Sequence, residues 1–287
     1  MNKKQIALLE ITVIYFIVAV GGYATFQYFK EEPLVFRMLY ADLAMTVVTY
    51  IFSVIKKNSS VYDAYWSVIP FYFILQYFYL FDGADWSTPQ WICAFVVSLW
   101  SWRLTLSWAR GWSGWEHEDF RYVSFRHQFK AFFQPINFLA IHLYPTLIVF
   151  ASMWGLQWVY ETGVLEIGWL FYLGAATAFV GTIFEYLADN ELAKFRLRPN
   201  KKKDDILRTG IWAKSRNPNY LGEMMFWFGV AMMGTAYAAP WYTVLGSVGM
   251  WMMFMFASIP LKDKQMMKNR PESFQKYKKE VSRVLPF

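Results

Sequence analysis

Eight long apolar runs dominate the 287-residue sequence. The hydrocarbon core of a bilayer takes about 20 apolar residues per helix. Runs of that kind lie at residues 5–29, 35–55, 61–81, 89–109, 135–159, 165–188, 219–236 and 240–260. The segments between them are too short for a large separate domain. The sequence therefore predicts an all-α, polytopic membrane bundle of about eight transmembrane helices, forming a single domain over residues 1–287.

The composition excludes several other classes of protein. The chain is 56% hydrophobic and 17% charged, whereas soluble domains carry about 25% charged residues. The single cysteine, Cys93, cannot form an intrachain disulfide, and no Cys/His set has metal-ligand spacing. Structural zinc and thiol redox chemistry are thus excluded, and no metal site is predicted. The first run is too long for the core of a signal peptide and lacks a small-residue cleavage site, so we expect it to be retained.

The basic residues fix an orientation for these spans. If the N-terminus is cytoplasmic, nearly all of the 28 lysine and arginine residues fall in cytoplasmic segments, as the positive-inside rule requires. The opposite loops are mostly acidic, with Glu31, Glu32, Asp82, Asp85, Glu161 and Glu166 beside Lys30. Both termini are therefore expected in the cytoplasm. We expect an integral protein of a bacterial inner membrane, or of the endoplasmic reticulum in a eukaryote. Its partners would be the bilayer and a lipophilic small molecule, not nucleic acid; the sequence does not indicate an oligomeric state.

Ionisable residues inside the predicted spans point to a functional interior. Such groups are costly in a membrane and usually face a bundle interior or an aqueous cavity. Most lie in the cytoplasmic halves of their spans, which favours a polar cavity open to the cytoplasm. The alternative is that they snorkel or cap helices; for Asp63, which follows Ser60, a capping box fits as well as a catalytic role. The set comprises Glu10, Asp42, Asp63, Arg103, Glu185, Asp189 and Glu223.

One polar stripe leaves the sixth span. Glu185, Asp189 and Arg196 stand at i, i+4 and i+11, which on an α-helix places them within about 40° of one another. A simple network within the helix would give the same stripe.

A basic segment follows this stripe, and a new apolar helix follows the segment. Pro218 biases Asn217 away from helix, so Asn219 is expected to cap that helix. A helix N-terminus among arginines and lysines suits phosphate groups. Contact with lipid headgroups is the alternative, but the carboxylate of Glu223, near the start of an apolar helix, favours a site.

At these residues the sequence resembles the steroid 5α-reductase C-terminal domain family, particularly its uncharacterised bacterial branch. The stretch SRNPNYLGEMMFWFG resembles the family signature of a basic turn followed by N-Y/F-x-G-E. FEYLADNELAKFR, RLTLSWARG with EDFRY, and the tail IPLKDKQMMKNRPESFQKYKKEVSRVLP resemble its other elements. The resemblance runs from about Asp63 to the end. It implies variable N-terminal helices over residues 1–60 and a reductase-like bundle over 61–287.

The resemblance further implies a cofactor and an activity. Members of this family take cytosolic NADPH into a pocket between the later helices and reduce a C=C bond conjugated to a carbonyl in a lipid. For this chain the site would be formed mainly by residues 180–287. Asn219 and Glu223 match positions that hold the nicotinamide, and Tyr220 lies between them in the signature. The other matching or charge-bearing candidates for cofactor binding are Arg103, Arg110, Glu185, Asp189, Arg196, Arg208, Arg216 and Asp263. No G-x-G-x-x-G follows a predicted strand, so the binding would not be of the Rossmann type.

The substrate end departs from the family pattern. Trp100 aligns with the tyrosine that donates to the substrate carbonyl, and an indole N–H cannot pass on a proton. The glutamate partner of that tyrosine aligns near Val68, which leaves Asp63 as the nearest carboxylate. The missing proton donor would be replaced by Tyr62, Tyr65, Tyr122 or Asp63, unless the substrate is not a steroid enone. We predict Asp63 and Tyr65 as the catalytic pair.

Two other functions remain open at this point. An isoprenylcysteine or phospholipid methyltransferase, with S-adenosylmethionine as cofactor, resembles this chain in its late helices, but its R-H-P turn reads Arg216-Asn217-Pro218 here. A transporter or scaffold is the non-enzymatic alternative; a transporter should show internal repeats and helices interrupted at mid-membrane, and neither is evident. His142 is interpreted as a hydrogen-bonding residue of the bundle. Gly174 and Ala178 form a helix-packing pattern.

Overall fold

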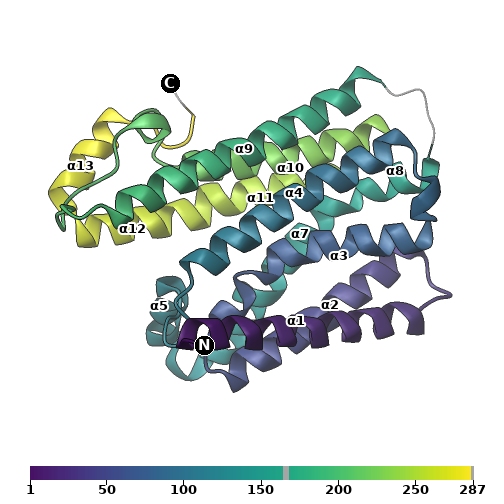
Figure 1. Ribbon diagram of the computed structural model, residues 1–287, viewed down its shortest axis with the longest axis horizontal. Coiled ribbons are helices and arrows are strands. Elements are labelled where there is room, and N and C mark those ends of the chain that lie inside the picture. Colours follow the sequence, from purple (N-terminus) through teal and green to yellow (C-terminus); the bar gives the residue numbers. More distant parts are fainter. Residues whose placement is uncertain (164–167, 286–287) are drawn as a thin grey trace. The chain divides into compact units, whose positions relative to one another are not determined.

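The computed structural model describes residues 1–163 and 168–285, and its regular secondary structure in these ranges is entirely helical. The all-α prediction is therefore confirmed. The chain divides into two compact units, Met1–Leu165 and Glu166–Phe287 (Figure 1). The predicted Glu166 and the start of the predicted span 165–188 lie outside the described residues. Whether the chain acts as one membrane domain stays a prediction.

The first unit is built from α1 to α8. Long helices alternate here with short 3₁₀ and π segments. The elements are α1 (Lys3–Tyr28), α2 (Leu34–Ile55), η1 (Ser59–Tyr62), α3 (Tyr65–Leu80), η2 (Gly83–Asp85), α4 (Thr88–Gly111), α5 (Phe120–Phe129), η3 (Lys130–Phe132), α6 (Phe133–Ile136), η4 (Asn137–Leu143), α7 (Tyr144–Trp154) and α8 (Leu156–Thr162).

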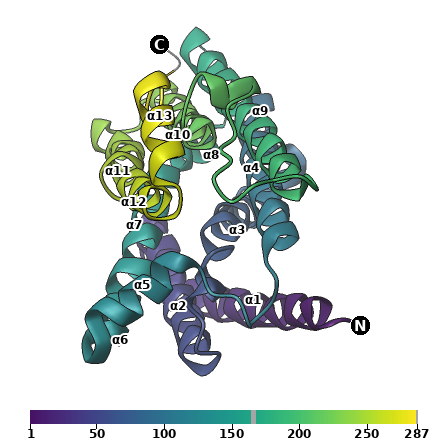
Figure 2. The same cartoon turned by 90° about the vertical axis from the view of Figure 1, so that its left-hand side faces the viewer.

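The second unit continues with α9 to α13. Figure 2 shows α11, α12 and α13 following one another, with α13 turned back beside α12. The elements are α9 (Trp169–Leu197), η5 (Gly210–Ala213), α10 (Pro218–Ala236), η6 (Trp241–Val244), α11 (Leu245–Met253), η7 (Phe254–Ser258), α12 (Ile259–Asn269) and α13 (Pro271–Glu280).

Six helical segments among the described residues are long and apolar enough to cross a membrane. They correspond to six of the eight predicted spans. The segments are Lys3–Tyr28, Leu34–Ile55, Thr88–Gly111, Phe120–Thr162, Trp169–Leu197 and Trp241–Asn269.

The helices α3 and α10 are absent from that set. α3 has only 16 residues, and α10 begins with a polar turn that contains Asn219 and, one turn later, Glu223. The outer surface of α1 is apolar, with Phe16 70% and Leu9 55% exposed. An apolar exposed face of this length suits lipid contact.

Small residues hold α9 against α10 in the second unit, where Figure 1 shows the two helices side by side. A Cβ atom added to Gly181 would lie 2.6 Å from the Gly222 carbonyl oxygen, and one added to Gly229 would lie 2.5 Å from the Gly174 carbonyl oxygen and 2.7 Å from the Ala178 Cβ. The early residues of α9 thus meet the late residues of α10, so the two helices are antiparallel. The predicted packing role of Gly174 and Ala178 is confirmed.

Candidate functional site

The loop between α9 and α10 is fixed by one glycine and one tryptophan. Gly210 has φ +57°, and a Cβ atom at this position would meet the carboxylate of Glu191. The left-handed backbone favours glycine here, and a larger residue would also displace the end of the Glu191 side chain. Two residues later, the indole N–H of Trp212 donates to the carbonyl oxygen of Ala188 at 3.0 Å. These contacts hold the loop on α9 and thereby set where α10 begins.

Arg216 joins the end of this loop to the C-terminal part of the chain. Its side chain is 6% exposed and its Nη1 lies 3.1 Å from Oδ2 of Asp263 on α12. Its Nε donates to the carbonyl oxygen of Val281 at 3.2 Å. The structure therefore brings together two predicted residues, Arg216 and Asp263, that are far apart in the sequence.

Lys262 lies at the centre of the same group. Its ammonium donates to Oδ1 of Asn217 at 2.8 Å and to the carbonyl oxygen of Arg216 at 3.2 Å. It also lies 5.0 Å from the ring centroid of Trp212 and 5.4 Å from that of Tyr220, where a cation is attracted to the ring faces. We call Arg216, Asn217, Lys262 and Asp263 the α10 cluster.

Two further predicted residues act on this cluster. The charges of Asp189 and Arg196, both on the last turns of α9, reach Lys262 together with those of Arg216 and Asp263. Two of the three residues of the polar stripe predicted on the sixth span therefore lie within electrostatic reach of the α10 cluster. Sequence reasoning missed Lys262 and Asn217 as site residues, although Lys262 directly precedes the predicted Asp263.

The first turns of α10 carry the remaining candidates of the second unit. Asn217 is the N-cap residue and Pro218 the first helical residue, so the expectation that Asn219 caps the helix is wrong. Proline occupies the first position because its fixed φ suits it and it has no N–H to leave unpaired. Oδ1 of Asn219 is buried without a hydrogen-bond partner in the described part of the chain. Tyr220 stacks on Phe254 with ring centroids 4.9 Å apart.

The contacting helices α9 and α10 each carry a buried carboxylate. Glu223 on α10 is 2% exposed and accepts a hydrogen bond from the indole N–H of Trp227 at 3.0 Å. Glu185 on α9 is 4% exposed, and a Cβ atom at Gly222 would lie 2.9 Å from its Cγ. Glycine at 222 therefore admits the Glu185 side chain beside the helix turn that carries Glu223.

Arg208, another residue predicted to bind the cofactor, contacts α13; its assignment to cofactor binding stays a prediction. Its Nη1 lies 2.9 Å from Oε2 of Glu280, and its Nη2 donates to the carbonyl oxygen of Ser273 at 2.8 Å. It therefore fastens α13 to the loop. An open groove of about 410 Å³ lies there, lined by acidic, basic and neutral side chains. Its lining residues are Asp204, Asp205, Ile206, Arg208, Glu272, Ser273 and Lys276.

The other predicted arginines lie on α4 of the first unit. Arg103 is half-buried, and Arg110 is exposed at the C-terminal end of the helix. The carbonyl oxygen of Arg110 accepts a hydrogen bond from Lys4 at 2.7 Å. Their assignment to cofactor binding stays a prediction.

The predicted catalytic residues Asp63 and Tyr65 lie in separate hydrogen-bond networks of the first unit. The Tyr65 hydroxyl donates to Oδ1 of Asp42 at 2.8 Å. Asp63 instead accepts a hydrogen bond from the Tyr122 hydroxyl at 2.5 Å, and its Oδ1 lies 3.8 Å from Nη2 of Arg121. Burial raises the pKa of the Asp63 carboxyl from 3.8 to about 6, although Arg121 acts in the opposite direction. The hydroxyl partner of Asp63 is therefore Tyr122.

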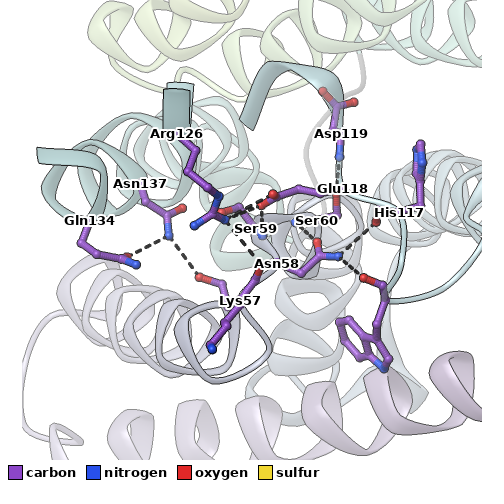
Figure 3. A network of polar contacts seen from close by, with 12 residues as sticks. Lys57, Asn58, Ser59, Ser60, His117, Glu118, Asp119, Arg126, Gln134 and Asn137 are labelled. Atoms are coloured by element: carbon purple, nitrogen blue, oxygen red, sulfur yellow. Dashed lines mark hydrogen bonds and ion pairs between the residues drawn. The ribbon is translucent and has the colours of Figure 1, made fainter. Parts of the chain in front are cut away.

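A polar network joins the segment just before Asp63 to the loop that leads into α5 (Figure 3). The side-chain amide of Asn58 donates to the carbonyl oxygens of Trp115 and His117, both at 3.0 Å. Glu118 accepts from the backbone N–H of Ser59 at 2.8 Å and pairs with Arg126 at 2.9 Å. The backbone before Asp63 is thereby tied to the loop that leads into α5, which carries Tyr122.

Comparison with known proteins places the chain in a family. It belongs to the DUF1295 family of proteins of unknown function, which it matches over residues 49–281. It is 27% identical over 236 residues to an uncharacterized protein of Schizosaccharomyces pombe. That alignment covers 72% of this chain and 66% of the relative, just under two thirds of the relative's length. No solved structure matches the chain.

Proposed function

We propose that this protein is an NADPH-dependent membrane reductase that acts on a C=C bond conjugated to the carbonyl of a lipid or steroid-like substrate. The observation that carries the proposal is the α10 cluster together with the buried carboxylates Glu185 and Glu223 on the same helix pair. One helix start thus combines cations for phosphates with acceptors for an amide. The resemblance to the steroid 5α-reductase family suggests that the ligand of this combination is NADPH.

The residues present fit the charges and donors of NADPH. Its pyrophosphate and 2′-phosphate are anionic, and Lys262 and Arg216 offer an ammonium and a guanidinium beside a helix N-terminus. Its nicotinamide ends in a carboxamide whose NH₂ group needs acceptors. Oδ1 of Asn219 is a buried acceptor with no hydrogen-bond partner among the described residues, and the Glu223 carboxylate is a second acceptor one turn away. When bound, the cofactor would supply the hydride.

The chain itself would supply the proton. Asp63 with Tyr122 is the proposed donor pair, because the carboxyl, with its side chain only 15% exposed, accepts from a hydroxyl and its pKa is raised to about 6. A carboxyl with such a pKa stays protonated to a higher pH, nearer to neutral, than an exposed carboxyl does. The hydroxyl of Tyr65, the other predicted catalytic residue, donates a hydrogen bond to Asp42 instead. The substrate would enter from the lipid phase.

We further propose eight spans with both termini in the cytoplasm, in a bacterial inner membrane or the endoplasmic reticulum. The helices α3 and α10 are less apolar or shorter than the other spans, yet both are largely covered by neighbouring helices. Tyr65, Phe73 and Tyr77 of α3 and Phe226 and Trp227 of α10 are each 3% exposed or less. A span lined by protein instead of lipid need not be uniformly apolar.

Ligand binding by the purified protein tests the proposed cofactor. We expect NADPH binding to weaken at least about tenfold in Lys262→Met and in Glu223→Gln, since each loss of a charged hydrogen-bonding group costs about 1.5–3 kcal/mol. Lys264→Met, an exposed neighbour on α12, is the matched control and should bind like the wild type. Titration calorimetry with NADPH and S-adenosylmethionine gives the measurement. Binding of S-adenosylmethionine without NADPH binding would refute the reductase and support the methyltransferase alternative.

A further inference from the structure

An unbroken row of side-chain hydroxyl groups crosses the interior of the first unit and ends on Asp42. The Tyr65 hydroxyl donates to Oδ1 of Asp42 at 2.8 Å, and Thr46 Oγ1 lies 3.2 Å from the Tyr65 hydroxyl. Thr46 and Thr146 have their hydroxyl oxygens 2.9 Å apart, and the Thr146 oxygen lies 2.8 Å from the Tyr62 hydroxyl. We call Tyr62, Thr146, Thr46 and Tyr65 the hydroxyl row.

Every member of the row is buried, and so is its terminal acid. Asp42 is 0% exposed and the four hydroxyl-bearing residues are between 1% and 3% exposed. Asp42 lies in α2, about 20 Å along the helix axis from its last residue, Ile55, at 1.5 Å per residue. The acid is therefore deep within a segment that is apolar enough to cross a membrane.

Asp42 has no cationic partner there. It forms no ion pair with any residue in the ranges 1–163 and 168–285, and its second oxygen, Oδ2, is buried without a hydrogen-bond partner in the same ranges. The titratable groups that face the row and its acid are Tyr15 of α1, whose ring packs edge-on against that of Tyr65, and also Tyr72 of α3 and His142 of η4. An unpaired carboxylate in an apolar interior costs several kcal/mol. A proton on Oδ2 removes that charge.

The far end of the row reaches the polar end of the unit. Tyr62 is the last residue of η1, which the network of Figure 3 ties to the loop before α5 through Ser59 and Ser60. The ring of His142 lies edge-on to Tyr62 at 4.9 Å, and its Nε2 is buried without a hydrogen-bond partner among the described residues. A protonatable nitrogen thus stands beside the outer end of the row.

We propose that the first unit contains an intramembrane proton-loading site, with Asp42 as the terminal acid and the hydroxyl row as its proton path. Each hydroxyl accepts one proton from the Tyr62 side and passes its own proton toward Asp42. The net result is one proton taken up at Tyr62 and one O–H bond formed on Oδ1 of Asp42, the oxygen that Tyr65 contacts. Rotation of the carboxyl group about its Cβ–Cγ bond then brings this O–H to the unpartnered Oδ2 position, and the Tyr65 hydroxyl again donates to the other oxygen. The row needs one rearrangement for this, because the Thr146 hydroxyl also donates to the carbonyl oxygen of His142 at 2.8 Å. This site is independent of the proposed cofactor site, which lies in the second unit.

Infrared difference spectroscopy tests the terminal acid. In lipid films at neutral pH, the wild-type spectrum minus that of Asp42→Asn should contain the C=O stretching band of a protonated carboxylic acid, and heavy water should shift it. Tyr65→Phe should move this band to higher frequency, because it removes the hydroxyl that donates to the Asp42 oxygen, and it probes the same acid if Asp42→Asn does not fold. Absence of the band from the first difference, or a band that Tyr65→Phe leaves in place, overturns the proposal.

The exchange rate of the same band tests the path. Thr146→Val keeps the shape of the side chain but removes the hydroxyl at the centre of the row. We expect it to slow the heavy-water shift of the Asp42 band at least about tenfold. Ser152→Ala removes another buried α7 hydroxyl, whose one hydrogen bond among the described residues is to the Ile148 carbonyl oxygen. This variant should exchange at the wild-type rate. A Thr146→Val film that exchanges as fast as the wild type shows that the row is not the path.

Discussion

Asp63 links one side chain to the pH dependence of the whole fold. Its pKa is about 6 in the folded protein against an ordinary value of 3.8, chiefly because of burial. A raised folded pKa gives a stability contribution that is fully present below pH 3.8 and is lost as the pH rises through about 6. Above pH 6, where Asp63 is ionised, the free energy of unfolding is therefore lower than at acidic pH, where Asp63 is neutral.

The stability of Asp63→Asn relative to the wild type should consequently increase as the pH rises. The asparagine can still accept from the Tyr122 hydroxyl but never ionises. Between pH 4.5 and 7.5 we expect the difference in unfolding free energy to move in favour of the variant by about 1–3 kcal/mol, since one pKa unit is about 1.4 kcal/mol. Thermal unfolding in detergent at both pH values measures it. Asp204→Asn, at an exposed loop position, should show no such trend, and an equally flat Asp63→Asn would contradict the burial argument.

At the scale of helices, close contact between α9 and α10 places Glu185 beside the turn of α10 that carries Glu223. A Cβ atom at Gly222 would lie 2.6 Å from the Gly181 carbonyl oxygen and 2.9 Å from the backbone N of Glu185. Because these are backbone atoms, the helices must separate. Gly222→Ala should lower the unfolding free energy by about 1–3 kcal/mol, the range for overpacking. Gly21→Ala on α1, where nothing lies within 4 Å, should be neutral or stabilising. Thermal unfolding compares the two variants; equal stability contradicts the close packing.

The parts of the site that could be predicted from the sequence depend on local patterns. The stripe of Glu185, Asp189 and Arg196 follows from helical periodicity, and the packing of Gly174 and Ala178 follows from their spacing. Lys262 could not be assigned in this way, because its partner Asn217 lies 45 positions away. The sequence favours Asp63 and Tyr65 as the catalytic residues, with Tyr122 as one alternative donor. It could not show that Tyr122, 59 positions away, provides the hydroxyl that Asp63 accepts from.

For the whole molecule, the decisive question is on which side of the membrane each loop lies. With eight spans and a cytoplasmic N-terminus, the loop at Glu31 and η2 at Ala84 face outward, whereas the basic loop at Lys203 faces the cytoplasm. If α3 and α10 did not span, Ala84 would face the cytoplasm and Lys203 the outside. The second arrangement would leave the basic residues between α9 and α10 outside, against the positive-inside rule.

Cysteine labelling separates these arrangements. In a Cys93→Ser background, single cysteines at Glu31, Ala84 and Lys203 place one thiol at an exposed position in each loop. In intact right-side-out vesicles we expect a membrane-impermeant maleimide to label the cysteines at 31 and 84, and to label the one at 203 only after permeabilisation. Labelling at 31 and 203 but not at 84 would mean six spans. Labelling at 203 alone would mean eight spans of inverted orientation, with the α10 cluster on the side where cytosolic NADPH is absent.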